Sequence, residues 1–270
     1  MTSRVTDDED ATMDRQTVRL RIDDFIATVT MDNPPVNAQN RQFHEDMMSV
    51  FDEISDRDDV RVAVLTGAGK VFSAGADIKG RAGKVREAGE QWGHSRRARE
   101  CFHSIVECRK PVIAAVNGAA LGAGLALVAS CDIIVAAENA VIGLPEIDVG
   151  LMGGGRHAMR LFGRHSLVRR MMFTGYRVPA AECYRLGVIE ACVPAGALME
   201  AAMDFARQIA AKSPVAMKLA KHSLNTIEDT SLRDGYRFEQ NMTAELGTTE
   251  DSREAMLAFA EKRKPVFKGR

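Results

Sequence analysis

The sequence predicts an α/β core followed by a carboxyl-terminal region that contains only helices. Short apolar runs rich in β-branched residues occupy residues 61–66, 111–116 and 132–136, and such runs are typical of buried strands. Segments with helical periodicity lie between these strands, and from about Ala195 onward only helical patterns remain. Alternation of strands and helices, followed by an all-helical end, predicts a core with a helical appendage.

The amino-terminal half contains a hairpin, a helix and a buried strand in the predicted order. Asp23 and Asp24 separate two strand patterns, and a stripe of apolar residues at helical spacing starts at Phe43. The expected elements are strands at 17–22 and 25–31, a loop at 32–40, a helix at 41–55, a strand at 61–66 and a long helix within 84–107.

The carboxyl-terminal half continues with two strands and then becomes helical. The expected elements are strands at 111–116, 132–136 and 188–193, and helices at 125–130, 166–174, 180–186, 198–212, 214–227, 232–246 and 251–262. The stretches at 117–127 and 67–79 are rich in glycine and are expected to be loops that follow strands.

Composition excludes several classes of function. The chain has 270 residues, of which 46% are hydrophobic, and a formal net charge of −1, so it has material for a core but no general attraction to nucleic acid or anionic membranes. No apolar run approaches the roughly 18 residues of a membrane-spanning helix. The six histidines show no metal-ligand spacing with one another or with cysteine, so no metal is expected.

Five cysteines without CxxC pairing indicate reduced, mostly buried thiols, and so a cytoplasmic protein. Residues 1–14 are acidic and polar, unlike a signal or transit peptide, and are expected to form a disordered tail.

Residues 110–155 carry the strongest chemical signal. Glycines at Gly118, Gly122 and Gly124 allow the main chain to press its N–H groups against a ligand. The helix expected at 125–130 would add the positive end of its dipole. Farther on, Glu146 is the one acid of an apolar Leu-Pro-Glu segment. An anion-stabilising turn beside a lightly solvated acid suits the chemistry of an enolate, although Glu146 could instead cap a turn.

Four motifs in order resemble the crotonase family, the enoyl-CoA hydratase/isomerase superfamily. They are SAGADIK, KPVIAAVNGAALGAG, CDI and LPEIDVG, and the resemblance extends from about Val18 to Arg270. It implies a crotonase-like spiral of ββα units at residues 15–195. It also implies a helical trimerisation region at 196–270 that builds a homotrimer or hexamer.

The resemblance implies that the backbone N–H groups of Ala76 and Ala123 polarise the carbonyl of an acyl-CoA thioester. CoA is then part of the substrate, and no other cofactor is implied. The positions implied to hold CoA are Ala74, Asp77, Ile78 and Lys79, together with Phe259 and Lys262, which in relatives reach the CoA of a neighbouring subunit. Asp77 could instead only cap the segment that follows it.

The sequence departs from the hydratase pattern at one catalytic position. Hydratases of the family use two glutamates, and here Glu146 matches one while Ala126 stands where the other is expected. A single glutamate favours moving a proton between two carbons of the substrate, which isomerises a double bond. Asp148 and His157 are close in sequence to Glu146 and could replace the lost acid.

The segment expected to meet the acyl group, residues 80–100, is polar and basic. Arg81, Trp92 and His94 are candidates to meet a polar or aromatic acyl group, and the alternative is an exposed charged helix face. Other reactions on the same oxyanion hole, dehydration or hydrolysis of a substituted acyl-CoA, remain open. So does a CoA-thioester-binding protein with little catalysis. A P-loop at 64–70 is excluded because Val71 stands where Ser or Thr is needed.

Overall fold

The computed structural model describes residues 15–81, 83 and 87–270, and the acidic segment at 1–14 lies outside the described residues. Within them, six strands form the largest sheet, in the spatial order β1 (Val18–Asp23), β2 (Ile26–Met31), β4 (Val62–Gly67), β7 (Val112–Val116), β9 (Ile133–Ala137) and β12 (Ala191–Val193). A second sheet has the order β11 (Arg177–Pro179), β10 (Val141–Gly143), β8 (Ala119–Leu121) and β5 (Val71–Ser73). A third sheet pairs β3 (Ala38–Gln39) with β6 (Gly75–Ala76).

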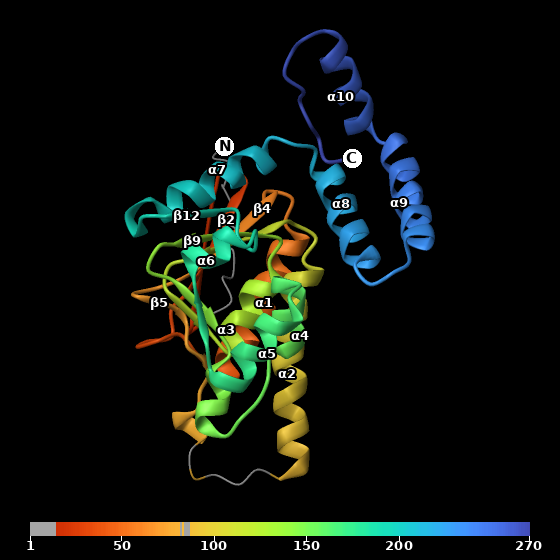
Figure 1. The fold of residues 1–270 in the computed structure, drawn as a ribbon. Helices are drawn as coiled ribbons and strands as arrows, with labels where there is room; N and C mark the ends of the chain where they lie inside the picture. The colour runs from red at the N-terminus through yellow and green to blue at the C-terminus, as the bar shows by residue number, and fades with distance from the viewer. Residues whose placement is uncertain (1–14, 82, 84–86) are drawn as a thin grey trace, which may run out of the picture.

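Helices α1 to α7 pack around these sheets, and α8 to α10 lie to one side of them (Figure 1). They are α1 (Arg41–Asp56), α2 (Ala88–Glu107), α3 (Ala123–Ser130), α4 (Gly155–Phe162), α5 (His165–Thr174), α6 (Ala180–Arg185), α7 (Leu198–Ala210), α8 (Pro214–Ile227), α9 (Leu232–Gly247) and α10 (Glu250–Ala260). Short 3-10 helices are η1 (Lys79–Arg81), η2 (Pro145–Val149) and η3 (Ala195–Ala197).

In the centre of the chain a strand of the six-stranded sheet is followed by a strand of the second sheet and then by a helix, and this path occurs three times. β4 enters the six-stranded sheet and β5 the second sheet before α2 begins; β7, β8 and α3 repeat this path, and so do β9, β10 and α4. From β2 to β12 the strands of the six-stranded sheet pair in parallel. The topology is therefore the spiral of ββα units that the resemblance implies.

Both faces of the central strands β4 and β7 are buried, which explains why these strands are unbroken apolar runs in the sequence. In β4, Val62 and Val64 share a hydrophobic cluster with Leu198 and Ala202 of α7, whereas Leu65 belongs to the cluster on the opposite face. Helix α7 crosses this sheet in Figure 1. It therefore packs as part of the core, although the sequence-based division placed it in the helical region that starts at residue 196.

Helix α1 forms on the opposite face and closely matches the expected range of 41–55. Its N-cap is Asn40, whose side chain accepts a hydrogen bond from Phe43 N at 2.8 Å. Its apolar stripe packs into the main core, and the buried positions of the helix include Phe43, His44, Met47, Val50, Phe51 and Ile54.

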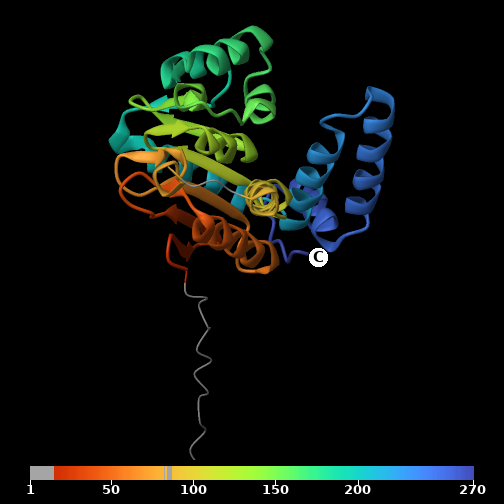
Figure 2. The same ribbon diagram turned by 90° about the horizontal axis from the view of Figure 1, so that it is seen from below.

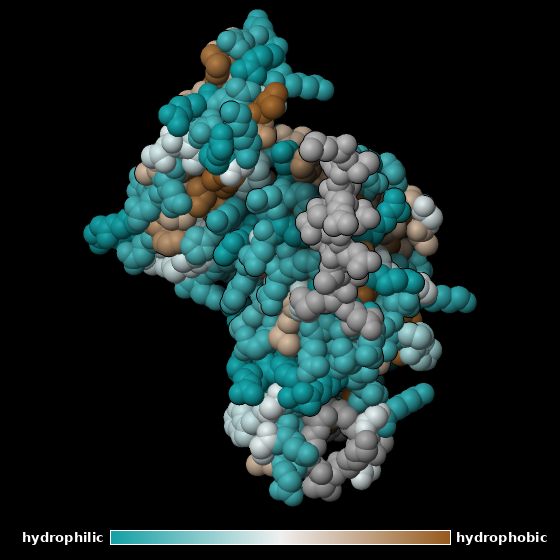
Figure 3. All heavy atoms as spheres, turned by 180° about the vertical axis from the view of Figure 1, so that it is seen from behind, coloured by the Kyte–Doolittle hydropathy of each residue, from teal (hydrophilic) through white to brown (hydrophobic). Residues whose placement is uncertain are grey.

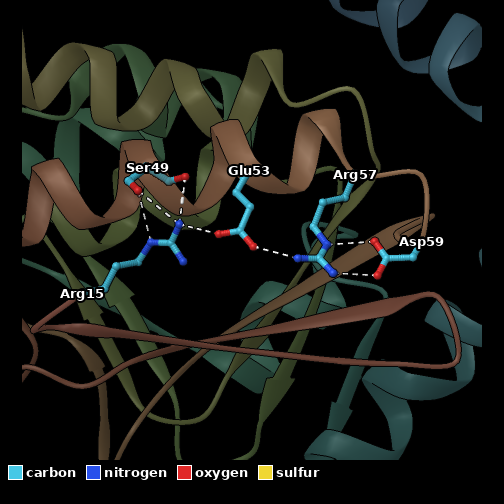
Figure 4. A network of polar contacts seen from close by, with 5 residues as sticks. All are labelled: Arg15, Ser49, Glu53, Arg57 and Asp59. Carbon is cyan, nitrogen blue, oxygen red and sulfur yellow. Dashed lines mark hydrogen bonds and ion pairs between the residues drawn. The ribbon is translucent and has the colours of Figure 1, made fainter. Parts of the chain in front are cut away.

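A network of charged side chains connects Arg15, the first described residue, to helix α1 (Figure 4). Arg15 Nη2 lies 2.6 Å from Glu53 Oε2 and 3.1 Å from Ser49 Oγ. The other oxygen of Glu53 lies 3.1 Å from Arg57 Nη1, and Arg57 in turn pairs with Asp59 at 2.7 Å. The side chain of Arg15 is only 8% exposed, so its charge depends on these partners.

Helices α8, α9 and α10 form an arm to one side of the sheets (Figures 1 and 2). Lys221 of α8 joins the arm to the core, because its buried Nζ lies 2.8 Å from Asp132 Oδ2 and donates to Ile105 O at 3.1 Å. Apolar residues show on the surface of the arm (Figure 3), and the exposed ones are Leu224, Leu232, Tyr236, Met256, Leu257, Phe259 and Val266. The predicted role of this region in trimerisation stays a prediction.

Some elements of the structure were not expected from the sequence. The three-residue strands β5, β8, β10 and β11 lie where loops or no element were expected, and α4 occupies residues that had no assignment. The strand expected at 188–193 is shorter, because β12 covers only its last three residues.

Candidate active site

A cleft of about 540 Å³ opens between the ends of the ββα units. Its walls come from α1, α2, α3, α4, β11, η2 and the segment around β6. Of the residues named from the sequence, the cleft is lined by Ala74, Ala76, Ile78, His94, Ala123, Ala126, Glu146, Asp148 and His157. The structure therefore brings together the three residues expected to carry the chemistry, namely Ala76, Ala123 and Glu146.

Two glycine-containing segments touch at the centre of this cleft. Gly75 has φ +88°, and a Cβ at this position would lie 2.5 Å from Leu121 O and 3.1 Å from Ala123 N. No side chain fits at such distances, so glycine is required at position 75 for the two segments to approach. Their contact places Ala76 and Ala123 beside each other, although they are far apart in the sequence.

Both alanine amides are oriented away from the regular hydrogen bonds of their own elements. Asp77 N donates to Gln39 O across the β3–β6 ladder, and because successive amides alternate in a strand, Ala76 N–H points to the other side. Ala123 is the first residue of α3, so its N–H has no acceptor within the helix. The first bond of α3 runs from Ala126 N to Gly122 O at 3.2 Å. Neither N–H group is therefore used in the regular hydrogen bonds of its own element.

Glu146 lies half-buried in η2, next to the amino end of α3. A Cβ at Gly122 would stand 2.7 Å from Glu146 Oε1, which shows how closely the carboxylate approaches this turn. Glu146 Oε2 is buried and has no hydrogen-bond partner among the residues that the structure describes. Burial raises the pKa of this carboxyl above its ordinary value. A carboxylate that is poorly solvated and unpaired is suited to take up and return a proton.

The position of the missing acid also faces the cleft. Ala126 is 1% exposed and lies on the wall formed by α3, about one turn beyond Ala123. Asp148 lines the cleft too, but it is exposed and packs against Gly175, where a Cβ would lie 2.9 Å from its Oδ2. His157 is half-buried, and its ring stands edge-on to that of Phe102 with centroids 5.1 Å apart.

Burial lowers the pKa of His157, and the nearby His103, Arg160 and Arg156 add to this effect. Its neutral ring can serve as a base or as a neutral hydrogen-bond partner. Asp148 and His157, the two residues that the sequence offers as replacements for the lost acid, thus both line the cleft.

Other residues named from the sequence lie elsewhere. Asp77 Oδ1 accepts a hydrogen bond from Gly80 N at 2.9 Å and so caps η1, where Lys79 is exposed. Trp92 is 76% exposed and does not line the cleft. Phe259 belongs to α10 and Lys262 follows it, so both lie in the arm and neither lines the cleft of its own chain. The side chain of Arg81 lies outside the described part of the structure.

Sequence reasoning missed further residues of the cleft. These include His44, Phe102, Met152 and Arg177. His44 carried a detectable signal, because it shares the buried helical stripe of Met47 and Phe51 at three-residue and seven-residue spacing. A histidine at such a position requires a partner or a function.

No group of three or more His, Cys, Asp and Glu side chains among the described residues is arranged to hold a metal ion. No helix in that same part of the chain combines the length and apolarity needed to cross a bilayer.

Comparison with known proteins identifies similar sequences and folds. The sequence profile of a family described as enoyl-CoA hydratase/isomerase matches residues 21–270. Probable enoyl-CoA hydratase 2, mitochondrial, of Arabidopsis thaliana is 35% identical over 252 residues, which cover 92% of this chain and 83% of that protein.

A hydrolase and a solved hydratase structure are also similar to this chain. The (7aS)-7a-methyl-1,5-dioxo-2,3,5,6,7,7a-hexahydro-1H-indene-carboxyl-CoA hydrolase of Mycobacterium tuberculosis is 37% identical over 235 residues, with 86% of this chain and 94% of the hydrolase covered. The crystal structure of an enoyl-CoA hydratase from Bacillus anthracis matches with a TM-score of 0.88 and 32% identity, covering 94% of this chain and 100% of that one. Both hydratases and a hydrolase are therefore among the similar proteins.

Proposed function

The chain belongs to the crotonase, or enoyl-CoA hydratase/isomerase, family of acyl-CoA enzymes, and we propose that it acts on an acyl-CoA thioester through an enolate. In this proposal the thioester oxygen accepts hydrogen bonds from the N–H groups of Ala76 and Ala123. Glu146 removes a proton from a substrate carbon, and the C–H electron pair moves into the enolate. Return of the same proton to a carbon two bonds away shifts the double bond.

The observation that carries the proposal is the environment of Glu146. Its Oε2 is buried without a partner in the described structure, in a cleft that Ala76 and Ala123 also line. Preorganised donors stabilise the developing negative charge most strongly where water is excluded, commonly by several kcal/mol. A base with a raised pKa next to such donors suits proton abstraction beside a carbonyl.

One acid favours isomerisation over hydration. Addition of water needs a group that activates the water and a group that protonates carbon, and Ala126 leaves only Glu146 of the expected pair. The similarity to a CoA hydrolase supports a second candidate, hydrolysis or dehydration of a substituted acyl-CoA. In that case Asp148 or His157, which line the same cleft, would act with Glu146.

A panel of 2-enoyl-CoA and 3-enoyl-CoA esters tests the proposal, with products identified by mass spectrometry and absorbance. We expect conversion of 3-enoyl to 2-enoyl esters to be faster than hydration of crotonyl-CoA. Tight binding of the esters without turnover would instead identify a CoA-thioester-binding protein with little catalysis. Release of free CoA would favour the hydrolase.

We propose further that the protein assembles as a homotrimer or hexamer through its helical arm. Phe259 is 88% exposed on α10, and Met256 and Leu257 of the same helix are also exposed. Such a surface suits contact with another copy, whose cleft would receive Phe259 and Lys262. Light scattering at micromolar concentration tests the assembly, and a monomer would contradict it. Phe259→Ala should weaken CoA-ester binding without unfolding the chain.

A cytoplasmic location is part of the same proposal. All five cysteines lie in described segments and are free thiols there, four of them buried, which suits a reducing compartment. The name of the Arabidopsis relative places that protein in mitochondria. Cell fractionation of the native host would distinguish the two locations.

A further inference from the structure

His44 is a buried polar side chain in the wall of the cleft that the proposed mechanism does not use. It lies on α1, is 1% exposed and lines the same cleft as Glu146. Neither Nδ1 nor Nε2 has a hydrogen-bond partner among the residues that the structure describes. Buried polar groups are almost always paired, so an orphaned imidazole on a cleft wall indicates a ligand that completes it.

The surroundings of His44 keep its ring uncharged near neutral pH. Burial lowers its pKa to about 4, and the positive groups of His94 and Arg97 add to this effect, while Glu45 opposes it. The ring of His94 lies 5.9 Å from that of His44, and Phe43 stands edge-on at 6.3 Å. A neutral imidazole has one N–H donor and one acceptor nitrogen. It can pair with a carbonyl or hydroxyl oxygen, and it carries no charge that would favour a carboxylate over them.

Helix α2 shows where this oxygen would lie in the cleft. The residues of α2 that line the cleft form one helical stripe: Gln91, His94, Ser95, Ala98 and Phe102. His94 meets His44 at one end of this stripe, and Phe102 meets His157 at the other. Phe102 follows His94 by eight positions, which corresponds to about 12 Å along the helix. This length of wall accommodates an acyl chain of several carbons.

We propose that His44 is a specificity-determining residue for the acyl group. The preferred substrates would be CoA thioesters whose acyl chain carries a keto or hydroxyl oxygen several carbons from the reacting atoms. This inference rests on the proposed acyl-CoA function. A purely hydrocarbon chain would leave both nitrogens of His44 dehydrated and unpaired, whereas an oxygen would accept the ring N–H. A site built to form such a hydrogen bond discriminates against the analogue that lacks the oxygen.

The test compares matched pairs of enoyl-CoA esters of increasing length. Each pair consists of an alkyl ester and the same ester with a keto group near its distal end, and a carboxylate-terminated ester of each length is added. The measured quantity is the ratio of kcat/KM between keto and alkyl esters. We expect wild type to prefer the keto ester by about tenfold or more at one chain length, the scale of one neutral hydrogen bond.

Variants assign the preference to His44. His44→Phe should bring the keto-to-alkyl ratio close to one, because phenylalanine offers no hydrogen bond to the keto oxygen. His44→Gln should retain part of the preference, because an amide also donates and accepts hydrogen bonds. His165→Phe makes the same change at an exposed position outside the cleft and should leave the ratio unchanged.

The outcomes separate this inference from the proposed function. Equal kcat/KM for keto and alkyl esters at every length in wild type would overturn the inference while leaving the enzyme assignment intact. A preference for the carboxylate esters, or a keto preference that survives in His44→Phe, would overturn it as well. If no CoA ester binds or reacts, the proposed function fails and the inference fails with it. The ratio in wild type does not depend on the folding of any variant.

Discussion

The carboxylate of Glu146 lies against the backbone of Gly122, where a Cβ would stand 2.7 Å from Glu146 Oε1. Gly122 also has φ +56° and forms the N-cap of α3, one residue before the expected oxyanion donor Ala123. One glycine therefore sets the start of the helix and makes room for the proposed acid/base. The position of the proposed oxyanion donor and the position of the proposed acid/base therefore both depend on Gly122.

Gly122→Ala should reduce turnover by about 100-fold, because displacing a catalytic group by about 1 Å has an effect of this size. The added methyl group would displace Glu146 and strain a backbone conformation that suits glycine. Gly187→Ala is the matched control: Gly187 has φ +71°, but a Cβ there meets nothing within 4 Å. The control should lose stability by about 1–2 kcal/mol from strain alone and keep its turnover. Equal activity of the two variants would contradict the proposed contact.

Glu146→Gln should keep the fold and the binding of CoA esters and lower turnover by about 100-fold or more, the scale of a lost general base. The amide of glutamine has nearly the same shape as the carboxylate of glutamate, but it cannot act as a base near neutral pH. Turnover by wild type should fall in acid at a higher pH than the ordinary pKa of a glutamate would give, because burial raises the pKa of Glu146 and the base must be ionised. A variant with the wild-type rate would refute the assignment.

The same substitution has an expected effect on stability. A carboxyl whose pKa is raised by folding contributes its full stability below the pKa of the unfolded chain, and this contribution is lost progressively as the pH rises through the folded pKa. At neutral pH the buried charge of Glu146 is therefore destabilising. Glu146→Gln should melt at a higher temperature than wild type at pH 7, and the difference should shrink as the pH falls toward 4. A variant that melts lower at pH 7 would indicate that Glu146 has a structural partner.

The location of the proposed catalytic residues was predictable where a local motif carries them. Glu146, Ala76 and Ala123 lie in short motifs that the sequence makes recognisable, and the structure places all three on one cleft, while their catalytic roles stay predictions. His44 was not found because its signal is a polar residue inside an apolar helical stripe, and such a residue is usually paired within the core. Only the three-dimensional structure shows that its ring nitrogens lack a partner among the described residues.

The fold, too, was predictable only where the local sequence carries a clear signal. Long elements with clear periodicity, such as α1 and the central strands β4 and β7, lie where the sequence predicted them. Strands β8 and β10 have three residues each; β8 contains two alanines and β10 ends in glycine. Such short segments have little strand propensity of their own, so they form because they pair with neighbouring strands. Helix α7 has the pattern of any amphipathic helix, and the sequence alone does not show that the sheet, rather than the arm, covers its apolar face.

Glu53→Gln should destabilise the fold by about 1–3 kcal/mol, because it removes a charged partner from the nearly buried Arg15. Glu53 bridges Arg15 and Arg57, with contacts of 2.6 Å and 3.1 Å (Figure 4). Glu45→Gln is the matched control on the same helix, since Glu45 pairs with Arg41 at the surface, where the side chains are 40% and 73% exposed. The control should change stability by less than about 0.5 kcal/mol. Unfolding in urea measures both, and equal effects would show that the Arg15 network is not coupled to folding.

Ala126→Glu should increase the addition of water to crotonyl-CoA. Ala126 lies on the wall of the cleft at the position where the family's second acid is expected, and it is 1% exposed. A glutamate there would share a poorly solvated site with Glu146. Two neighbouring carboxylates push one pKa upward, so that one stays protonated as an acid while the other serves as a base near neutral pH. Wild type, which has one of the two, should hydrate crotonyl-CoA poorly.

Ala126→Gln is the control for the added volume, because it has the size of glutamate without its acid. If the acid is what wild type lacks, Ala126→Glu gains hydratase activity and Ala126→Gln does not. A glutamate buried without a partner is destabilising, so melting curves of both variants accompany the rates. Strong hydration of crotonyl-CoA by wild type would refute the idea that position 126 limits the reaction. Asp148 or His157, the other titratable groups considered near Glu146, would then supply the second acid, and the substitutions Asp148→Asn and His157→Phe would show which of them does.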